Sequence, residues 1–166
     1  DVNGLREMYS DLEFYSFLKD FKEEEKKEEK LEYKIIENID DLKLKEKVSA
    51  YLEISETNYH NADIYGMSLY DGENAYYVPF EVLKENKNIL GEKEIYTYDL
   101  KKMIVSLNKY GIDIKNCTFD AMIAGYILNY NVKDDIAYLA NTFNCDITLF
   151  DNFKKEKDMS TEALAD

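Results

Sequence analysis

The fold of this chain is decided by the stretch Val48-Ser49-Ala50-Tyr51-Leu52-Glu53-Ile54. This apolar run is bounded by polar residues and predicts a buried strand that carries one carboxylate, Glu53, in its middle. Cleavage of a phosphodiester by two metal ions needs clustered carboxylates, because hard divalent cations bind oxygen ligands and lie about 4 Å apart in such sites. A single acid beside Tyr51 and Leu52 is too few for that. The stretch is therefore typical of an active-site strand that has lost its metal-binding chemistry.

The residues around this strand predict an α/β domain with a mixed central sheet flanked by helices. Asp71-Gly72 is a hairpin turn signal between two strands, Pro79 ends the second of them, and Gly111 closes a helix. Three consecutive strands joined by short turns imply an antiparallel meander, and strand and helix alternate after it. We expect strands at 33–36, 48–54, 64–70, 75–78 and 93–98, and helices at 39–47, 80–86, 99–110, 119–129 and 134–143.

The N-terminal part differs from the rest of the chain. Residues 3–21 have the apolar spacing of an amphipathic helix, and residues 22–30 contain only Lys and Glu, which is typical of a solvated helix or a linker. We therefore expect a helical, charged linker segment at 1–30 and one domain at 31–166. The chain starts at Asp1 without a signal-peptide pattern, and we expect it to be a fragment of a longer protein.

Composition narrows the function classes. The formal net charge is −14, from 35 acidic and 21 basic residues, and affinity for DNA depends on the number of phosphates neutralised by Lys and Arg. We therefore expect the isolated domain to bind DNA weakly. No run of about 18 apolar residues exists, so no membrane span is predicted. Cys117 and Cys145 form no CxxC pair and are expected to be ordinary thiols in a reducing cytoplasm.

Four stretches carry a family likeness, in this order along the chain: Tyr51-Leu52-Glu53-Ile54-Ser55-Glu56-Thr57-Asn58-Tyr59-His60-Asn61-Ala62, Tyr98-Asp99-Leu100-Lys101-Lys102, Thr118-Phe119-Asp120-Ala121-Met122 and Asp134-Asp135-Ile136-Ala137-Tyr138-Leu139-Ala140. They resemble the motif regions and following helices of the 3′–5′ exonuclease domain of bacterial DNA polymerase I. The likeness covers about residues 31–150. The segment from Glu53 to His60 is especially similar to the Bacillus-type polymerases, whose proofreading domain is degenerate.

The resemblance implies a ribonuclease H-like 3′–5′ exonuclease fold. Active members of this family hold two metal ions with an Asp-x-Glu pair on the first strand, an Asp from the second motif and a Tyr-x-x-x-Asp on a later helix. One ion generates the attacking water and the other stabilises the leaving oxygen. Mg²⁺ or Mn²⁺ is thus implied for an active domain, and no cofactor is expected if the activity is lost.

This chain departs from that ligand pattern. Counted back from Gly66, the Asp of the first pair falls on Tyr51, while its Glu falls on Glu53. The Asp of the second motif is Asp99 by local string and Met103 by ungapped counting from Gly111; the Bacillus-type spacing favours Met103. The third motif is not found in place, because its two bare string matches, Tyr130 to Asp134 and Tyr59 to Asp63, lie too early and in predicted loops or turns.

Each candidate residue also has a purely structural interpretation. Glu53 can be a strand residue that is hydrogen-bonded to a neighbour or faces solvent. Asp99 and Asp120 stand where helix N-caps are expected. His60, the single histidine, is predicted to lie in a turn without a metal or nucleophile partner. Abundant tyrosines, Tyr76, Tyr77 and Tyr126 among them, are expected to pack in the core and at its rim.

The leading hypothesis is a catalytically inactive 3′–5′ exonuclease-like domain of DNA polymerase I, which acts in DNA replication and repair and here serves a structural role. One alternative is an active proofreading exonuclease that uses Glu53, Asp99 and a third acid from the C-terminal tail. Another is an acidic protein-interaction module on the same fold. The implied partners are the polymerase and 5′-nuclease domains of the same protein, DNA through the full-length protein, and no membrane. The expected location is the bacterial cytoplasm, near the nucleoid.

Overall fold

The computed structural model describes residues 32–55, 58–130, 132–133 and 136–143, together with Cys145, Ile147, Thr161 and Leu164. The chain divides into two units, Asp1–Leu31 and Glu32–Asp166, and all described residues belong to the second. The predicted helix at 3–21, the Lys/Glu run at 22–30 and most of the polar tail after 148 lie outside the described residues. The linker assignment of residues 1–30 therefore stays a prediction.

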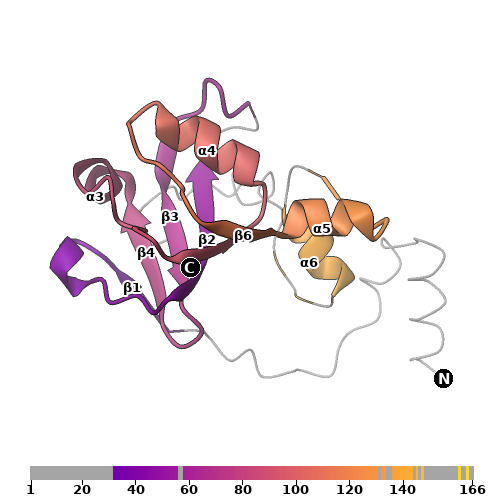
Figure 1. The fold of residues 1–166 in the computed structure, drawn as a ribbon, viewed down its shortest axis with the longest axis horizontal. Helices are drawn as coiled ribbons and strands as arrows, with labels where there is room; N and C mark the ends of the chain where they lie inside the picture. The colour runs from indigo at the N-terminus through magenta and orange to yellow at the C-terminus, as the bar shows by residue number, and fades with distance from the viewer. Residues whose placement is uncertain are drawn as a thin grey trace. The chain divides into compact units, whose positions relative to one another are not determined.

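A single mixed sheet organises the described residues (Figure 1). Its strands are β1 (Tyr33–Ile35), β2 (Lys47–Ile54), β3 (Ile64–Tyr70), β4 (Ala75–Pro79), β5 (Glu94–Thr97) and β6 (Cys117–Asp120), in the spatial order β1-β4-β3-β2-β5-β6. β2, β3 and β4 form an antiparallel meander, whereas β1 joins β4, and β5 and β6 follow β2, in parallel. The predicted α/β class and mixed sheet are confirmed.

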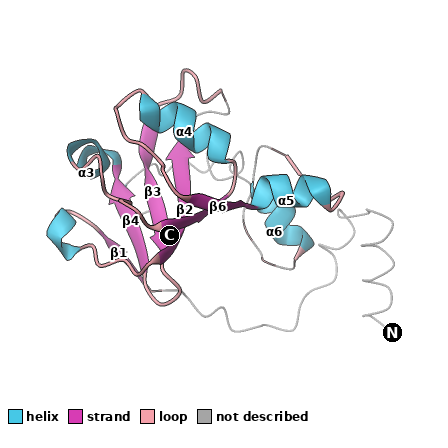
Figure 2. Ribbon diagram, in the orientation of Figure 1, coloured by secondary structure: helices cyan, strands magenta, loops and turns pink. Residues whose placement is uncertain are grey.

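Short helices follow the strands (Figure 2). They are the 3-10 turn η1 (Ile39–Asp41), α3 (Phe80–Glu85), α4 (Leu100–Asn108), α5 (Ala121–Ile127) and α6 (Ile136–Thr142). Leu83 of α3 and Met103 and Leu107 of α4 are fully buried in the same hydrophobic cluster as β2. These two helices therefore cover the apolar face of the sheet.

The central strand β2 separates the core from the candidate site by its alternation. Val48, Ala50, Leu52 and Ile54 are buried in the core, whereas Tyr51 and Glu53 are half-buried. Because successive side chains of a strand point to opposite faces, Tyr51 and Glu53 share the face away from that core. One strand therefore anchors the fold and carries the candidate residues.

The predicted turn and helix end have the expected geometry. The Asp71 Oδ1 atom accepts hydrogen bonds from the backbone N–H groups of Glu73 and Asn74 at 3.1 and 2.8 Å, and Gly72 has φ +91°. After α4, the Ile112 N–H donates to Leu107 and the Gly111 N–H to Asn108, with Gly111 at φ +70°. These are the two bonds of a Schellman motif, which favours glycine at the left-handed position.

The predicted helix at 39–47 is wrong beyond its first turn. Only Ile39–Asp41 is helical, and an extended segment follows in which Leu42 and Leu44 both pack against the core. Residues two apart lie on nearly opposite sides of a helix but on one side of an extended chain. The carbonyls of Lys43 and Leu44 accept bonds from the side chains of Tyr76 and Lys93 instead of helical N–H groups.

The helix predicted at 119–129 begins two residues later, after a strand that the sequence did not indicate. Residues 117–120 form β6, in which Phe119 pairs with Tyr96 of β5. A strand of four residues at the sheet edge is too short to show a clear two-residue period. Asp120 ends this strand and caps α5, so the predicted N-cap is confirmed.

Gly66 tests the packing of the meander. A Cβ atom at Gly66 would lie 2.5 Å from the Tyr77 hydroxyl oxygen and 2.7 Å from the Val78 carbonyl oxygen. We expect Gly66→Ala to lower the free energy of unfolding by about 2–3 kcal/mol, because overpacking against backbone forces the strands apart. Urea denaturation of the variant measures this loss. Ser68→Ala, two residues further along β3, is the control and should change stability by about 0.5 kcal/mol at most. Equal effects of the two variants would contradict the close packing at Gly66.

Candidate functional site

Glu53 and Tyr51 define the candidate site on β2. Glu53 lies opposite Gly66 of β3, and Tyr51 lies opposite Ser68. Gly66 has no side chain, and the Tyr77 hydroxyl of β4 reaches over it. The Glu53 carboxylate thus lies on a surface formed by three neighbouring strands. It is the single carboxylate that β2 places there, as the sequence predicted.

A lysine from the adjacent helix faces this strand. α4 starts directly after β5, which runs parallel to β2 with Thr97 opposite Ala50. Lys102, in the first turn of α4, is 7% exposed and places its Nζ atom 4.3 Å from the centroid of the Tyr51 ring. The position that the family resemblance assigns to a metal ligand therefore holds an aromatic ring beside a buried cation.

Asp99 caps α4. Its carboxylate accepts a hydrogen bond from the Lys102 backbone N–H at 3.0 Å, and the residue is 8% exposed. Its φ of +60° is a left-handed conformation, which an aspartate adopts only at a cost. The N-cap interpretation of Asp99 is confirmed.

Met103 lies in the core. It is 1% exposed and belongs to the hydrophobic cluster under the sheet. A thioether in an apolar cluster offers no oxygen to a hard cation. Whether the second motif is aligned on Asp99 or on Met103, the residue found there already has a structural task.

Asp120 has a structural role that the sequence showed only in part. Its Oδ1 atom accepts from the N–H groups of Met122 and Ile123 at the start of α5, at 2.9 and 3.4 Å. The same carboxylate accepts from the N–H groups of Asp99 and Leu100 at the start of α4, at 3.1 and 2.8 Å. It therefore binds four backbone donors and joins two helix N-termini, a long-range contact that local sequence patterns do not indicate.

Tyr77 shares the site face with Glu53. Burial raises the pKa of Tyr77 to about 12, and the nearby Glu53 carboxylate adds to this shift because a second negative charge is unfavourable. Among the described residues, the Tyr77 hydroxyl is buried and has no hydrogen-bond partner. The neighbouring Tyr76 hydroxyl donates to the Lys43 carbonyl at 3.2 Å. Both tyrosines are buried, as predicted.

The remaining candidates have structural places as well. His60 is exposed in a turn, where its carbonyl accepts from Lys109 Nζ at 2.7 Å. Tyr59 lies in the same turn and Asp63 follows it, whereas Asp134 lies outside the described residues. Both cysteines are free thiols, and burial raises the pKa of Cys117, which makes it a poor nucleophile at neutral pH.

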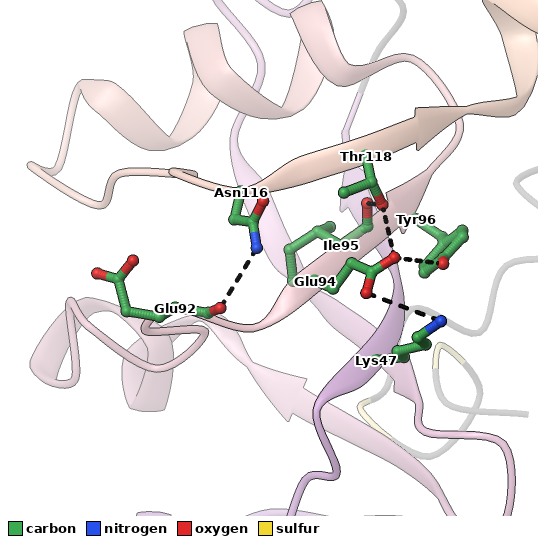
Figure 3. A network of polar contacts seen from close by, with 7 residues as sticks. All are labelled: Lys47, Glu92, Glu94, Ile95, Tyr96, Asn116 and Thr118. Atoms are coloured by element: carbon green, nitrogen blue, oxygen red, sulfur yellow. Dashed lines mark hydrogen bonds and ion pairs between the residues drawn. The ribbon is translucent and has the colours of Figure 1, made fainter.

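A polar network supports β5, the strand that leads to α4 (Figure 3). The Glu94 carboxylate accepts from the Tyr96 hydroxyl at 2.6 Å and from Thr118 Oγ1 at 3.4 Å, and Lys47 Nζ lies 3.8 Å away. These groups come from β2, β5 and β6. Glu94 is thereby an acid held by three strands, and it stabilises their parallel pairing.

Comparison with solved structures defines the class of fold. The EXO domain of Nibbler from Aedes aegypti superimposes with a TM-score of 0.54 over 82% of each chain, at 11% sequence identity. The described sheet and helices therefore have the fold of this EXO domain. None of the described helices is long and apolar enough to span a membrane.

Sequence comparison then defines the family. Residues 50–153 match the family described as DNA polymerase I, ribonuclease H-like domain, and the chain belongs to this family. DNA polymerase I of Bacillus subtilis is 31% identical over 57% of the chain, that of Bacillus caldotenax 28% over 80%, and that of Lactococcus lactis 29% over 86%. The chain spans only 11–17% of the length of these relatives.

The described residues do not fit a pair of divalent metal ions. Within the part of the chain that the structure describes, no group of three or more His, Cys, Asp or Glu side chains is arranged to hold a metal ion. The family resemblance assigns one carboxylate to the position of Tyr51 and another to that of Met103 or, by local string, of Asp99. A phenol and a buried thioether are poor ligands for Mg²⁺, which demands oxygen donors in near-octahedral geometry.

The shared cap of Asp120 predicts a large loss on its removal. We expect Asp120→Ala to lower the free energy of unfolding by about 2–4 kcal/mol, because two helix N-termini lose an anionic acceptor at once and a single cap is worth about 1 kcal/mol. Thermal unfolding followed by circular dichroism measures the loss. The exposed Asp113→Ala serves as the matched control and should be nearly neutral. A neutral Asp120→Ala would show that the carboxylate does not join α4 and α5.

Replacement by phenylalanine should have opposite effects on stability at the adjacent Tyr76 and Tyr77. Tyr77→Phe removes a buried hydroxyl that has no described acceptor, so stability at pH 7 should stay level or rise by up to about 1 kcal/mol, whereas Tyr76→Phe loses a hydrogen bond and should cost about 1 kcal/mol. Since the pKa of Tyr77 is about 12 in the folded state and 10.0 is the ordinary value, its contribution is complete below pH 10 and is lost between pH 10 and 12. Chemical denaturation at pH 7 and at high pH checks both points: the stability of wild type should fall more steeply above pH 10 than that of Tyr77→Phe. Equal pH slopes would be the contrary result.

Proposed function

We propose that this chain is a catalytically inactive 3′–5′ exonuclease-like domain of a DNA polymerase I, kept for a structural role in that protein. The family and the fold support the assignment to an exonuclease-like domain of DNA polymerase I. The residues at the ligand positions support the loss of its activity. The proposal concerns the domain's own hydrolytic activity. Polymerase activity, replication and repair belong to the longer protein.

The loss of oxygen ligands is the observation that carries the proposal. Two-metal hydrolysis needs an ion to generate the nucleophile and an ion to stabilise the leaving oxygen, and each ion needs carboxylates. Tyr51 and Met103 supply none. Glu53 is the one acid that remains at a ligand position in both alignments. A single carboxylate does not hold two divalent ions about 4 Å apart.

The alternative alignment does not rescue the site. If Asp99 is the second-motif acid, its carboxylate accepts the Lys102 N–H as a helix cap, and its backbone N–H is held by Asp120. Metal binding would have to compete with the cap that starts α4. The same turn places the Lys102 ammonium over Tyr51, and a fixed positive charge there opposes the binding of a divalent cation.

A structural role accounts for a fold that is present without the full set of metal ligands. The relatives are several times longer than this chain, and in them the domain is one part of a polymerase. α5 and the turn after it expose Ile123, Tyr126, Ile127 and Leu128, with 53–75% of each side chain accessible. Exposed apolar patches of this kind mark contacts with other protein surfaces. We assign this surface to contact with the remainder of the polymerase. DNA binding is a separate property, which we assign to the full-length protein.

An end-labelled nuclease assay tests the proposal. The polymerase that contains this domain is incubated with 3′-labelled single-stranded DNA and with a frayed primer, in Mg²⁺ and in Mn²⁺, without nucleotides. We expect no release of labelled nucleotide above the level of the same polymerase carrying Glu53→Gln, because no metal pair is formed. Hydrolysis that Glu53→Gln abolishes would refute the proposal and establish the active-exonuclease alternative.

A further inference from the structure

An open hollow outside the candidate site combines aliphatic surface with lysines. It lies between η1, with the extended segment after it, and the turn that joins α3 to β5, and its volume is about 570 Å³. The apolar part of its lining consists of Ile39, Leu42, Leu44 and Ile89. All four side chains are half-buried, so the hollow presents apolar surface that a ligand can cover.

The charged part of the lining has one sign. Lys43, Lys87 and Lys93 line the hollow, and no described acidic residue does, although the chain has 35 acidic and 21 basic residues. Among the described residues, no carboxylate lies within ion-pair distance of these three ammonium groups. Lys93 Nζ donates to the Leu44 carbonyl at 2.9 Å, which fixes one positive charge in place. This lysine hollow is therefore a positive site on an acidic domain.

A second hollow shows the contrast. Lys43 lines it as well, together with Lys34, Glu32, Asp41 and Glu73. The Lys34 Nζ atom lies 3.8 Å from the Asp41 carboxylate. The second hollow thus supplies counter-charges for its own lysines, whereas the lysine hollow leaves its positive charge to a ligand.

We propose that the lysine hollow binds a short acidic peptide segment of a separate protein. Its carboxylates would pair with the lysines, and an apolar side chain between them would cover the aliphatic lining. A peptide supplies both chemistries because successive side chains of an extended segment differ in direction and can differ in type. The side-chain amide of Asn88, which also lines the hollow, offers a donor and an acceptor to the peptide backbone.

A nucleic acid fits this site less well. Single strands bind where a basic groove is combined with aromatic rings on which bases stack. In the described part of the chain, no aromatic side chain lines the lysine hollow. Three lysines also neutralise few phosphates on a chain with a net charge of −14, which repels a long polyanion more than a short peptide.

The place of the lysine hollow favours a partner outside the polymerase. The exposed apolar surface of α5, assigned above to contact with the polymerase, follows β6 at one edge of the sheet. The lysine hollow includes η1, which follows β1 at the opposite edge, and Figure 1 shows β1 and α3 on the other side of the sheet from α5. A second protein can therefore reach it while α5 is covered. This inference goes beyond the proposed function and holds whether or not the domain hydrolyses DNA.

Fluorescence anisotropy tests the proposal on the polymerase that contains this domain, with excess primer-template DNA present to occupy its DNA-binding surface. The probe is a fluorescein-labelled peptide of sequence Asp-Glu-Leu-Asp-Glu-Leu-Asp-Glu, for which we expect a Kd on the order of 10–100 µM. Lys43→Gln combined with Lys87→Gln should weaken binding about fivefold or more, because two ion pairs are lost. The matched control, Lys101→Gln combined with Lys115→Gln, removes the same charge from residues outside the hollow and should change the Kd less than about twofold.

Three results would overturn the proposal. They are absence of binding, equal losses for the two double variants, and equal binding of a peptide with Ser in place of Leu, since the last would show ionic attraction without use of the aliphatic lining. Binding of labelled oligothymidylate that depends on Lys43 and Lys87, without binding of the peptide, would assign the hollow to nucleic acid instead.

A cross-linking experiment locates the peptide without any substitution. A carbodiimide joins a carboxylate directly to a lysine amine in contact with it, and mass spectrometry of the digested complex identifies the lysine. We expect the peptide on Lys43, Lys87 or Lys93 and competition by unlabelled peptide. Cross-links confined to other lysines would refute the assignment of the site and leave the result of the nuclease assay unaffected.

Discussion

The hydrogen bonds of the Asp120 carboxylate are the constraint on which the candidate site depends. This carboxylate binds the first N–H groups of α5 and also those of Asp99 and Leu100, one turn before Lys102. Asp99 is held in a left-handed conformation by this contact and by its own cap to α4. Strained residues persist only where the surrounding structure fixes them. The direction of α4, and with it the placement of Lys102 and Met103, follows from that joint.

The two faces of β2 separate stability from chemistry. Its buried residues pack with α3 and α4, so the strand keeps its place whatever stands on the other face. An aromatic ring at Tyr51, where the family resemblance implies a metal-binding carboxylate, therefore leaves the core intact. Hydrophobic burial is roughly proportional to apolar area and has no directional requirement, while metal binding needs several ligands in one geometry. A fold of this kind can lose its reaction without losing its stability.

The sequence predicted the elements that have long or well-marked patterns. The elements that it missed were missed for definable reasons. β2, β3 and α4 carry clear periodicity, and Asp71-Gly72 and Gly111 have residue types that their backbone angles require. The segment after Asp41 failed because Leu42 and Leu44 mimic a helical start while tertiary contacts draw both into the core. β6 failed because it is a four-residue edge strand. A local sequence pattern predicts the secondary structure where a segment of about ten residues can show its period, and tertiary packing determines the secondary structure elsewhere.

The same distinction between local pattern and tertiary packing applies to the residues of the candidate site. Counting from Gly66 and Gly111 assigns Tyr51, Glu53 and Met103 to ligand positions of the family, with Asp99 the alternative to Met103, and these assignments stay predictions. The shared cap of Asp120 and the approach of Lys102 to Tyr51 could not be predicted from the sequence, since each joins segments more than 20 residues apart in the sequence. In an acidic chain with a net charge of −14, no feature of the sequence singles out one buried lysine. Its place appears only when the end of β5 brings α4 alongside β2, so that the Lys102 Nζ atom lies 4.3 Å from the centroid of the Tyr51 ring.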